Sequence, residues 1–522
     1  MMPWLRLARL ARGSARWGEV RPHCVAAGAG AGAGEHSSDL FDYELPSYLI
    51  AQKPITWGES GPSRDDSRLL CVDIGTNALR HGRFSSVGDF LPTGSLLVAN
   101  NTKVVHARLL MRKRRTGGAV EAMVVSPATE GVDVPSASGG LERGERNKST
   151  WHCMLKGKNL RLGMELIVET EGLVLAGRVV KERSEGGQFA AVEFEWFPAT
   201  TGQGGGRGSE VSFGNVLEIF GKLPLPPYMK REAEERDLTS YQTVYSASAG
   251  SIAAPTAGLH FTKDLLARLA KEREVSLQQI TLHTGPGTFV PMQPGSRVRD
   301  HTMHTEVFSI TAQALRSILA HLVSRDSGSN SNRTKVKCEP PVVAVGTTTV
   351  RTLETLYWLG LRLLEEDRGN VSEMSVDDPG EAQKASKWDL GQWEAYRLVS
   401  RWHGNDWSHL PPAPVALERL LAELEAEDLK EVLGRTSVML APGYRFRVVD
   451  HVFTNFHAPK TTLMLLVSAF AADGGGKIDR NVLACPNIRS PHTPTFFHFL
   501  DLFHWQIWRR DGRGCFGRTR RP

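Results

Sequence analysis

Histidines that stand beside glycines and hydroxyl side chains form the densest chemical pattern in this sequence. His260 lies in the run AAPTAGLHFT, His283 lies in ITLHTGPGTF, and His304 follows a short coil. Glycine lets backbone N–H groups approach a ligand closely, and a neutral imidazole moves protons near pH 7. We therefore predict a functional site around these histidines. The alternative is that the glycines only form tight turns and that each histidine is structural.

Two later segments offer hydroxyl, amide and basic groups. The apolar run VVAV is followed by Gly346, three threonines and Arg351, and the segment TNFHAPK holds Asn455, His457 and Lys460. A strand that leads through glycine into a helix is how α/β domains present an anion or ribose site at the carboxyl edge of a sheet. Both segments are therefore further candidates for a binding site.

The elements that must position these groups are those of an α/β domain with an insertion. Short apolar runs predict strands at residues 69–72, 96–102 and 342–345, and helical periodicity predicts helices at residues 263–270, 311–323, 351–359, 393–402 and 416–432. Between residues 101 and 230, short alternating runs broken by glycine-rich turns are typical of a small antiparallel barrel or sandwich.

The predicted organisation has a larger domain, an inserted domain and two tails. It consists of residues 39–100 and 231–472 as the main α/β domain, residues 101–230 as the inserted β-barrel domain, residues 1–38 as a leader and residues 473–522 as an atypical C-terminal tail. Insertions at about residues 324–341 and 361–435 fall between the motifs, and we expect them to be surface loops.

Composition and charge exclude several classes of protein. In a chain of 522 residues there is no apolar run of about 18 residues, so the sequence predicts no membrane span. Six cysteines show no C-x-x-C spacing, which indicates free thiols and neither a disulfide framework nor a zinc site. The net charge of +6 suits a polyanionic partner. Residues 1–38 are rich in arginine and poor in acids, which predicts a transit peptide to a mitochondrion or chloroplast; without one, the protein is expected to be cytoplasmic.

Taken together, the motifs resemble one family. Residues 41–52, 64–70, 96–109, 223–231, 241–245, 253–262, 281–289, 301–306, 343–354 and 442–470 look, in this order, like the S-adenosylmethionine:tRNA ribosyltransferase-isomerases of queuosine synthesis. The most specific blocks are AAPTAGLHF and LPLPPYMKR. The resemblance covers roughly 300 residues in blocks between about residues 40 and 470.

The resemblance implies a fold and a reaction. The fold is a larger α/β domain around a mixed β-barrel with helices, plus the inserted smaller antiparallel β-barrel domain. The reaction transfers and isomerises the ribosyl group of S-adenosylmethionine onto 7-aminomethyl-7-deazaguanine at the tRNA wobble position, which gives epoxyqueuosine, adenine and methionine. No cofactor is implied, because S-adenosylmethionine is a consumed substrate. The expected partner is a tRNA anticodon stem-loop, and we favour a monomer.

Site residues follow from the matched motifs. The candidate catalytic residues are His260, His283, His304 and His457. The candidate substrate-binding residues are Thr256, Gly258, Gly285, Gly287, Thr347, Thr348, Thr349, Arg351, Asn455 and Lys460. The candidate tRNA-binding residues are Lys222, Lys230, Arg231, Arg112 and Arg114, with Tyr228, Tyr245, Phe261 and Phe289 as candidates for base stacking. No metal ligand is predicted.

The sequence departs from the family at its C-terminal end. After Phe470 the family continues through a helix rich in tyrosine and arginine and a final strand, and residues 473–522 show neither pattern. One alternative is therefore a catalytically impaired tRNA-binding relative. A second alternative, a metal hydrolase, rests on His301, His304 and Glu306, but His-x-x-His is a loose spacing for a zinc pair on a helix.

Overall fold

The structure is a computed structural model that describes most of the chain. The described residues are 34–57, 61–74, 78–128, 147–182, 189–199, 211–285, 287, 290–327, 339–369, 386–404, 406–473 and 505–509. Among the helices in these ranges, none combines the length and the apolar composition that a bilayer crossing requires. Residues 1–33, most of the predicted transit peptide, lie outside the described ranges.

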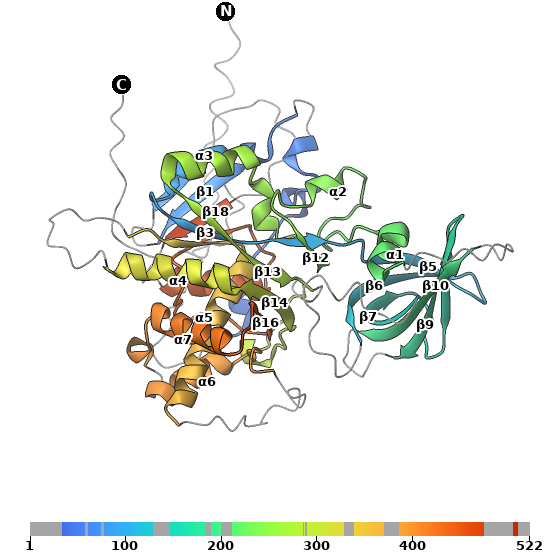
Figure 1. The fold of residues 1–522 in the computed structure, drawn as a ribbon. Coiled ribbons are helices and arrows are strands. Elements are labelled where there is room, and N and C mark those ends of the chain that lie inside the picture. The colour runs from blue at the N-terminus through green and yellow to red at the C-terminus, as the bar shows by residue number, and fades with distance from the viewer. Residues whose placement is uncertain are drawn as a thin grey trace, which may run out of the picture.

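A nine-stranded mixed sheet forms the centre of the larger domain (Figure 1). Its order is β16 (Glu431–Thr436), β14 (Glu306–Thr311), β13 (Ser276–His283), β3 (Leu96–Asn100), β15 (Val342–Val345), β17 (His451–Thr454), β18 (Trp505–Arg509), β1 (Arg68–Asp73) and β2 (Ala78–Arg83). The strands β13, β3, β15 and β17 are parallel neighbours. Every residue of β3, β15 and β17 is buried, as is usual for parallel strands that are covered on both faces.

Helices cover both faces of this sheet (Figure 1). Leu97 and Ala99 of β3 face a core with α3 (Lys263–Arg273), whereas Leu96 and Val98 face a larger core on the opposite side. The helices of that second side are α4 (Ala312–Ser327), α5 (Thr347–Asp367), α6 (Glu394–His403), α7 (Ala413–Ala426) and α8 (Thr462–Asp473). This arrangement of helix, sheet and helix confirms the predicted mixed α/β class.

A closed antiparallel barrel forms the second part of the molecule, at the right of Figure 1. Its strands pair in the order β5 (Arg108–Lys113), β6 (Ala119–Pro127), β7 (Lys148–Lys156), β10 (Ala190–Pro198), β9 (Leu173–Lys181) and β8 (Glu165–Glu169), and β8 pairs with β5 to close the ring. Buried and exposed residues alternate along β7, as the sequence pattern predicts. We propose residues 101–230 as the extent of this domain.

The remaining elements are short and connect the two parts. β4 (Thr102–Val104) leaves the main sheet toward the barrel, and β12 (Ser248–Ser251) pairs with it in parallel on the way back. Between them lie α1 (Phe213–Phe220), β11 (Gly221–Lys222) and α2 (Asp237–Ser240). Short 3-10 helices span Ser38–Phe41, Ser47–Leu49, Ile55–Trp57, Arg64–Asp66, Phe84–Phe90, Thr256–His260, Val298–Asp300 and Trp407–His409.

The second predicted insertion is not a surface loop where the structure describes it. Predicted helices there form α6 and α7, whose buried residues include Leu398, Leu417, Leu420 and Leu424 in the main core. Positions 417, 420 and 424 recur at helical spacing, so one face of α7 is apolar and must be buried. The sequence pattern predicts both helices but not that they complete the core of the larger domain.

Several element boundaries differ from those predicted. Helix α5 begins at Thr347, four residues before the predicted 351, and the Val350 N–H already donates to the Gly346 carbonyl at 3.2 Å. Helix α7 ends at Ala426, and β16 takes up the end of the predicted helix of residues 416–432. The tail, predicted to lack a final strand, contributes β18, which pairs with β1 in parallel and with β17 in antiparallel orientation.

Candidate active site

The carboxyl ends of the parallel strands bring the predicted polar groups to one edge of the sheet. β3 ends at Asn100, β13 ends at His283, β15 leads into Thr347, and β17 leads into Asn455. Ligands of open α/β sheets bind in the crevice outside the carboxyl ends of the strands. The structure thus gathers residues that lie far apart in the sequence at the location where this fold class builds its sites.

Asn100 ties three of these strand ends together. Its amide nitrogen donates to the Leu282 carbonyl at 2.9 Å and to the Thr348 hydroxyl at 3.4 Å. Its amide oxygen accepts from the backbone N–H of Leu282 at 3.0 Å and of Thr102 at 3.1 Å. The side chain is fully buried, so these bonds hold the ends of β3 and β13 and the start of α5 together. Sequence reasoning missed this role, although a buried strand that ends in Asn-Asn-Thr was the signal.

One ring nitrogen of His283 is hydrogen-bonded, and the other has no partner among the described residues. Its Nδ1 lies 2.8 Å from the Thr102 hydroxyl, and that hydroxyl donates to the Ser248 carbonyl at 3.4 Å. With the Thr102 proton directed at the Ser248 carbonyl, the Thr102 oxygen accepts from Nδ1–H and the lone pair lies on Nε2. Nε2 is buried and has no hydrogen-bond partner among the described residues. Burial lowers the pKa of His283 to about 4, so its imidazole is neutral at pH 7.

The backbone of Gly250 leaves the space that the His283 ring occupies. A Cβ on Gly250 would lie 2.9 Å from the imidazole, and the backbone φ of +145° is one that side-chain-bearing residues rarely adopt. Ser251, the next residue, accepts from the Thr284 N–H at 3.0 Å through its hydroxyl. The chain that returns from the barrel therefore packs directly against the residues that follow β13.

His457 and Asn455 lie in the loop that follows β17. The Nε2 of His457 lies 2.7 Å from the Thr454 hydroxyl, and the Tyr43 hydroxyl donates to the His457 carbonyl. Burial lowers the pKa of His457 to about 4. The Asn455 amide oxygen is buried without a partner among the described residues, so it remains available to a donor on a ligand.

Lys460, a predicted substrate contact, is engaged within the protein. Its ammonium group lies 2.9 Å from the carboxylate of Asp42 and 3.0 Å from that of Asp39. Its side chain is mostly buried. Lys460 therefore anchors the segment that carries Tyr43 to the loop after β17.

His260 lies on the other side of the strand ends. It ends the 3-10 helix Thr256–His260, is buried, and its Nδ1 lies 2.7 Å from the Ser67 hydroxyl. The backbone of Gly258 packs against Tyr245. Ala257 of the same turn lies against Gly346, the residue that follows β15. The turn that carries the predicted residues Thr256, Gly258 and His260 thus touches the sheet edge at Gly346.

His304 is held between the two parts of the molecule. On one side is Gly287, where a Cβ would lie 1.7 Å from the imidazole, so only glycine fits. On the other side is Phe189 of the barrel, whose ring centroid lies 6.3 Å from that of His304 at an interplanar angle of 74°. Burial lowers the pKa of His304, the Glu306 carboxylate raises it and Arg351 lowers it. Gly285, two residues before Gly287, faces open space.

Arg351 forms a buried ion pair with Glu306. The guanidinium lies on α5 and donates to the Glu306 carboxylate and to the Thr436 carbonyl at 3.3 Å. The side chains are 5% and 1% exposed, so the charge of Arg351 is neutralised inside the protein. Of the neighbouring threonines, Thr349 bonds within the helix and Thr348 accepts from Asn100, whereas Thr347 lies at the first residue of α5.

The Arg351–Glu306 ion pair also bears on the metal-hydrolase alternative. Within the described residues, no group of three histidine, cysteine, aspartate or glutamate side chains has the geometry of a metal site. The Glu306 carboxylate, the third group of that alternative, accepts from Arg351. No metal ligand is assigned to this site.

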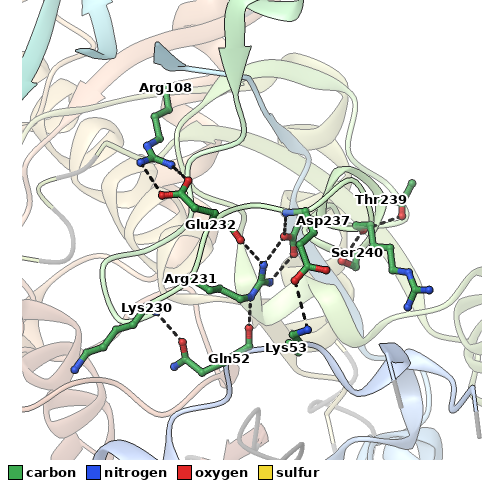
Figure 2. Close-up of polar contacts among 11 residues, drawn as sticks. Gln52, Lys53, Arg108, Lys230, Arg231, Glu232, Asp237, Thr239 and Ser240 are labelled. Atoms are coloured by element: carbon green, nitrogen blue, oxygen red, sulfur yellow. Dashed lines mark hydrogen bonds and ion pairs between the residues drawn. The ribbon is translucent and has the colours of Figure 1, made fainter. Parts of the chain in front are cut away.

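The predicted tRNA-binding residues fall into two groups, and Figure 2 shows one member of each, Arg231 and Lys230. Arg231 donates to both carboxylate oxygens of Asp237, at 2.7 and 2.8 Å, and to the Gln52 carbonyl, so its guanidinium is used inside the protein. The backbone N–H of Lys230 donates to the Gln52 amide oxygen at 2.7 Å, and its side chain is exposed. The exposed basic residues on this side of the molecule and on the barrel include Lys222, Lys230, Arg112 and Arg114.

The candidate stacking residues differ in exposure. Phe261 is 1% exposed and packs edge-on against Phe84 at 4.9 Å between ring centroids, so it is a core residue. Tyr228 and Tyr245 are partly buried, and burial raises the pKa of both. Phe289 lies outside the described residues.

Comparison with known proteins identifies similar chains. Residues 38–374 and 416–477 match the family model described as a queuosine biosynthesis protein. The chain is 34% identical over 432 residues to the S-adenosylmethionine:tRNA ribosyltransferase-isomerase of Pelobacter propionicus, which spans 83% of this chain and 90% of the relative. It is 35% identical, with the same coverage, to the enzyme of that name from Symbiobacterium thermophilum.

A solved structure is also similar. It is the S-adenosylmethionine tRNA ribosyltransferase of Thermotoga maritima, which is 22% identical, covers 90% of this chain and 99% of that chain, and aligns with a TM-score of 0.34.

Proposed function

This chain belongs to the queuosine biosynthesis protein family, and on that premise we propose that it makes epoxyqueuosine in tRNA. The family members it matches are tRNA ribosyltransferase-isomerases, so the protein is an enzyme of the transferase and isomerase class. The proposed acceptor is the amine of 7-aminomethyl-7-deazaguanine at the wobble position. The proposed donor is the ribosyl group of S-adenosylmethionine, which is consumed as a substrate while adenine and methionine leave.

The proposed reaction needs a base and an acid. The amine nitrogen forms a bond to the ribosyl carbon skeleton and loses a proton. C5′, a CH₂ group in the substrate, becomes a CH group in the product and loses a second proton. Methionine leaves with the electron pair of its C–S bond, adenine takes up one proton, and one proton is released. A base must therefore approach C5′, whose protons the sulfonium acidifies, and a donor must approach adenine.

His283 is the proposed base. The observation that carries this assignment is its buried Nε2, which has no partner among the described residues while Nδ1 is held by Thr102. A neutral imidazole with a fixed tautomer has its lone pair ready to accept a proton. His260 and His457 likewise have one ring nitrogen bonded to a hydroxyl, of Ser67 and Thr454, respectively, and we propose them as residues that orient the substrate.

His304 is the proposed proton donor to adenine. Burial, the largest effect, lowers its pKa although the Glu306 carboxylate raises it, so the neutral imidazole would donate through its ring N–H. The proposed contacts to ribose hydroxyls and to the methionine carboxylate come from Asn455, Thr347 and the backbone at Gly285 and Gly287.

The proposed RNA surface is basic and exposed. Lys230, together with Lys222, Arg112 and Arg114 on the barrel side, supplies cationic side chains for the anticodon stem phosphates. Tyr228 and Tyr245 are the remaining candidates for stacking on the unpaired base. We further propose that residues 1–38 direct the protein to an organelle and that the enzyme acts as a monomer.

The proposed function is tested with the full chain, S-adenosylmethionine and an anticodon stem-loop that carries 7-aminomethyl-7-deazaguanine. Adenine release is followed by chromatography, and the RNA is weighed by mass spectrometry. The expected result is adenine release together with the mass gain of one epoxycyclopentanediol group on the RNA. RNA binding without adenine release would instead support the alternative of a catalytically impaired tRNA-binding relative.

A further inference from the structure

The segment that carries His304 is clamped by a residue from outside the family match. The family model leaves residues 375–415 unmatched, and Gln392 lies in that stretch. Its amide nitrogen donates to the His301 carbonyl at 2.6 Å, and its amide oxygen accepts from the Met303 N–H at 3.0 Å. One side chain thus satisfies both a carbonyl and an N–H of the backbone that leads to His304.

Ion pairs on both sides fix the position of Gln392. Before it, the Asp389 carboxylate accepts from Arg435 at 2.6 Å and 2.9 Å. After it, the Glu394 carboxylate accepts from Arg362 at 2.8 Å. These groups are partly buried, which strengthens the pairs relative to exposed ones. The loop that presents Gln392 is therefore attached to β16 through one acid and to α5 through the other.

Apolar packing supports the same arrangement. Trp393, the next residue, packs against the cluster that contains Met292, Val298 and Met439, and Met303 packs against the same cluster. The backbone carbonyl of Gln392 accepts from the Met439 N–H at 3.0 Å. The clamp and the histidine segment thus share one small core, so a shift of either is transmitted to the other.

We propose that Gln392 is a positioning residue that sets the location of the His304 imidazole between Gly287 and Phe189. This inference rests on the proposed function for its catalytic consequence, but the position itself is measurable without turnover. The charged and titratable groups that face His304 are His301, Glu306 and Arg351. None of them changes in Gln392→Ala, so a change in the titration of His304 in that variant reports on its position.

The test compares Gln392→Ala and Gln392→Glu with Gln313→Ala, a control on the exposed face of α4. In Gln392→Ala, the Met303 amide is expected to exchange with solvent about tenfold faster, the factor of one lost hydrogen bond. The NMR titration of His304 should move away from that of the wild type. The kcat is expected to fall about tenfold to a hundredfold, with the KM for S-adenosylmethionine nearly unchanged.

Gln392→Glu keeps the side-chain volume and tests the two hydrogen bonds of the Gln392 side chain separately. Its carboxylate still accepts from Met303, but it has no N–H for the His301 carbonyl. We expect Met303 to stay protected while His304 titrates abnormally and kcat falls. Because the new carboxylate itself acts on the titration of His304, kcat and the protection of Met303 decide the question in this variant if Gln392→Ala fails to fold.

Three outcomes distinguish the proposal from its premise. A wild-type His304 titration in both Gln392 variants would overturn the proposal. A faster Met303 exchange with an unchanged titration and kcat would show a purely structural clamp and would also overturn it. If the wild-type protein itself releases no adenine, the proposed function fails, whereas the exchange and titration data still decide whether Gln392 positions His304.

Discussion

The Nδ1 atom of His283 lies 2.8 Å from the hydroxyl oxygen of Thr102, so a side chain at the end of β13 is oriented by the strand that leads into the barrel. The pairing orients the ring and leaves Nε2 without a partner among the described residues. A buried polar atom without a partner is costly in a folded protein. Its retention at the carboxyl edge of the parallel strands is what a base awaiting its substrate requires.

Replacing His283 is the first test of this relationship. In His283→Gln, the base is removed and an amide of similar reach is kept, so turnover should fall by about 10²–10⁴-fold. The measurement is the initial rate of adenine release under saturating substrates. His81→Gln, at an exposed position of β2, is the matched control and should retain the wild-type rate. Wild-type turnover in His283→Gln would remove His283 from the mechanism.

The same histidine should make the fold sensitive to acid. The folded-state pKa of about 4 lies below the ordinary value of 6.5, so the folded protein takes up this proton less readily than the unfolded chain. The contribution to stability is full above pH 6.5 and is lost as pH falls toward 4. Between pH 7 and pH 5, His283 should account for a loss of about 2 kcal/mol.

Urea unfolding of wild type and His283→Gln at these two pH values measures that difference. The wild type should lose more unfolding free energy on acidification than the variant does. His457 has a similarly lowered pKa and contributes in both proteins, so it cancels in the comparison. Equal losses in the two proteins would show that His283 is accessible to protons in the folded state.

Breaking the buried Arg351–Glu306 pair should destabilise the fold far more than breaking an exposed pair. Glu306→Gln leaves the Arg351 guanidinium buried without its counter-ion, which should cost about 3–5 kcal/mol of unfolding free energy. The control is Glu425→Gln, which breaks the exposed pair with Arg316 and should cost less than about 1 kcal/mol. Denaturant unfolding checks both values, and similar small losses would mean that water reaches Arg351.

Lys230 and Arg231 should respond differently to charge reversal. Lys230→Glu removes an exposed cation, so RNA affinity should fall and the slope of log K against log salt should decrease by about 1. Arg231→Glu instead leaves the buried Asp237 carboxylate facing a second acid, so it should destabilise the fold. Filter binding at several salt concentrations and thermal unfolding distinguish the two effects. Unchanged RNA affinity and salt slope in Lys230→Glu would exclude that side chain from the RNA surface.

Much of the fold follows from local pattern. Continuous apolar runs predict buried parallel strands, and β3 and β15 match them. Alternating runs predict the antiparallel barrel, because one face of each strand must be buried. The location of the candidate site at the carboxyl edge of the sheet also follows, because the polar residues after Ala99 and Val345 can be read from the sequence.

The contacts that define the candidate site do not follow from local pattern. Thr102 and His283 are separated by 181 positions, and Gln392 reaches Met303 across 89 positions, so only tertiary packing brings them together. The same holds for Arg231, whose sequence context indicates an RNA contact while the fold pairs it with Asp237. In the sequence alone, an arginine that faces solvent cannot be told from one that faces a buried carboxylate.

The central claim is that this enzyme removes a C5′ proton from S-adenosylmethionine while it transfers the ribosyl group to tRNA. The most direct measurement uses S-adenosylmethionine with both C5′ hydrogens replaced by deuterium and the anticodon stem-loop that carries 7-aminomethyl-7-deazaguanine. We predict that adenine is released and that the modified RNA retains one of the two deuterium atoms, with the reaction lost in His283→Gln. A modified RNA that retains both deuterium atoms, or an unmodified RNA with no adenine released, would contradict the account.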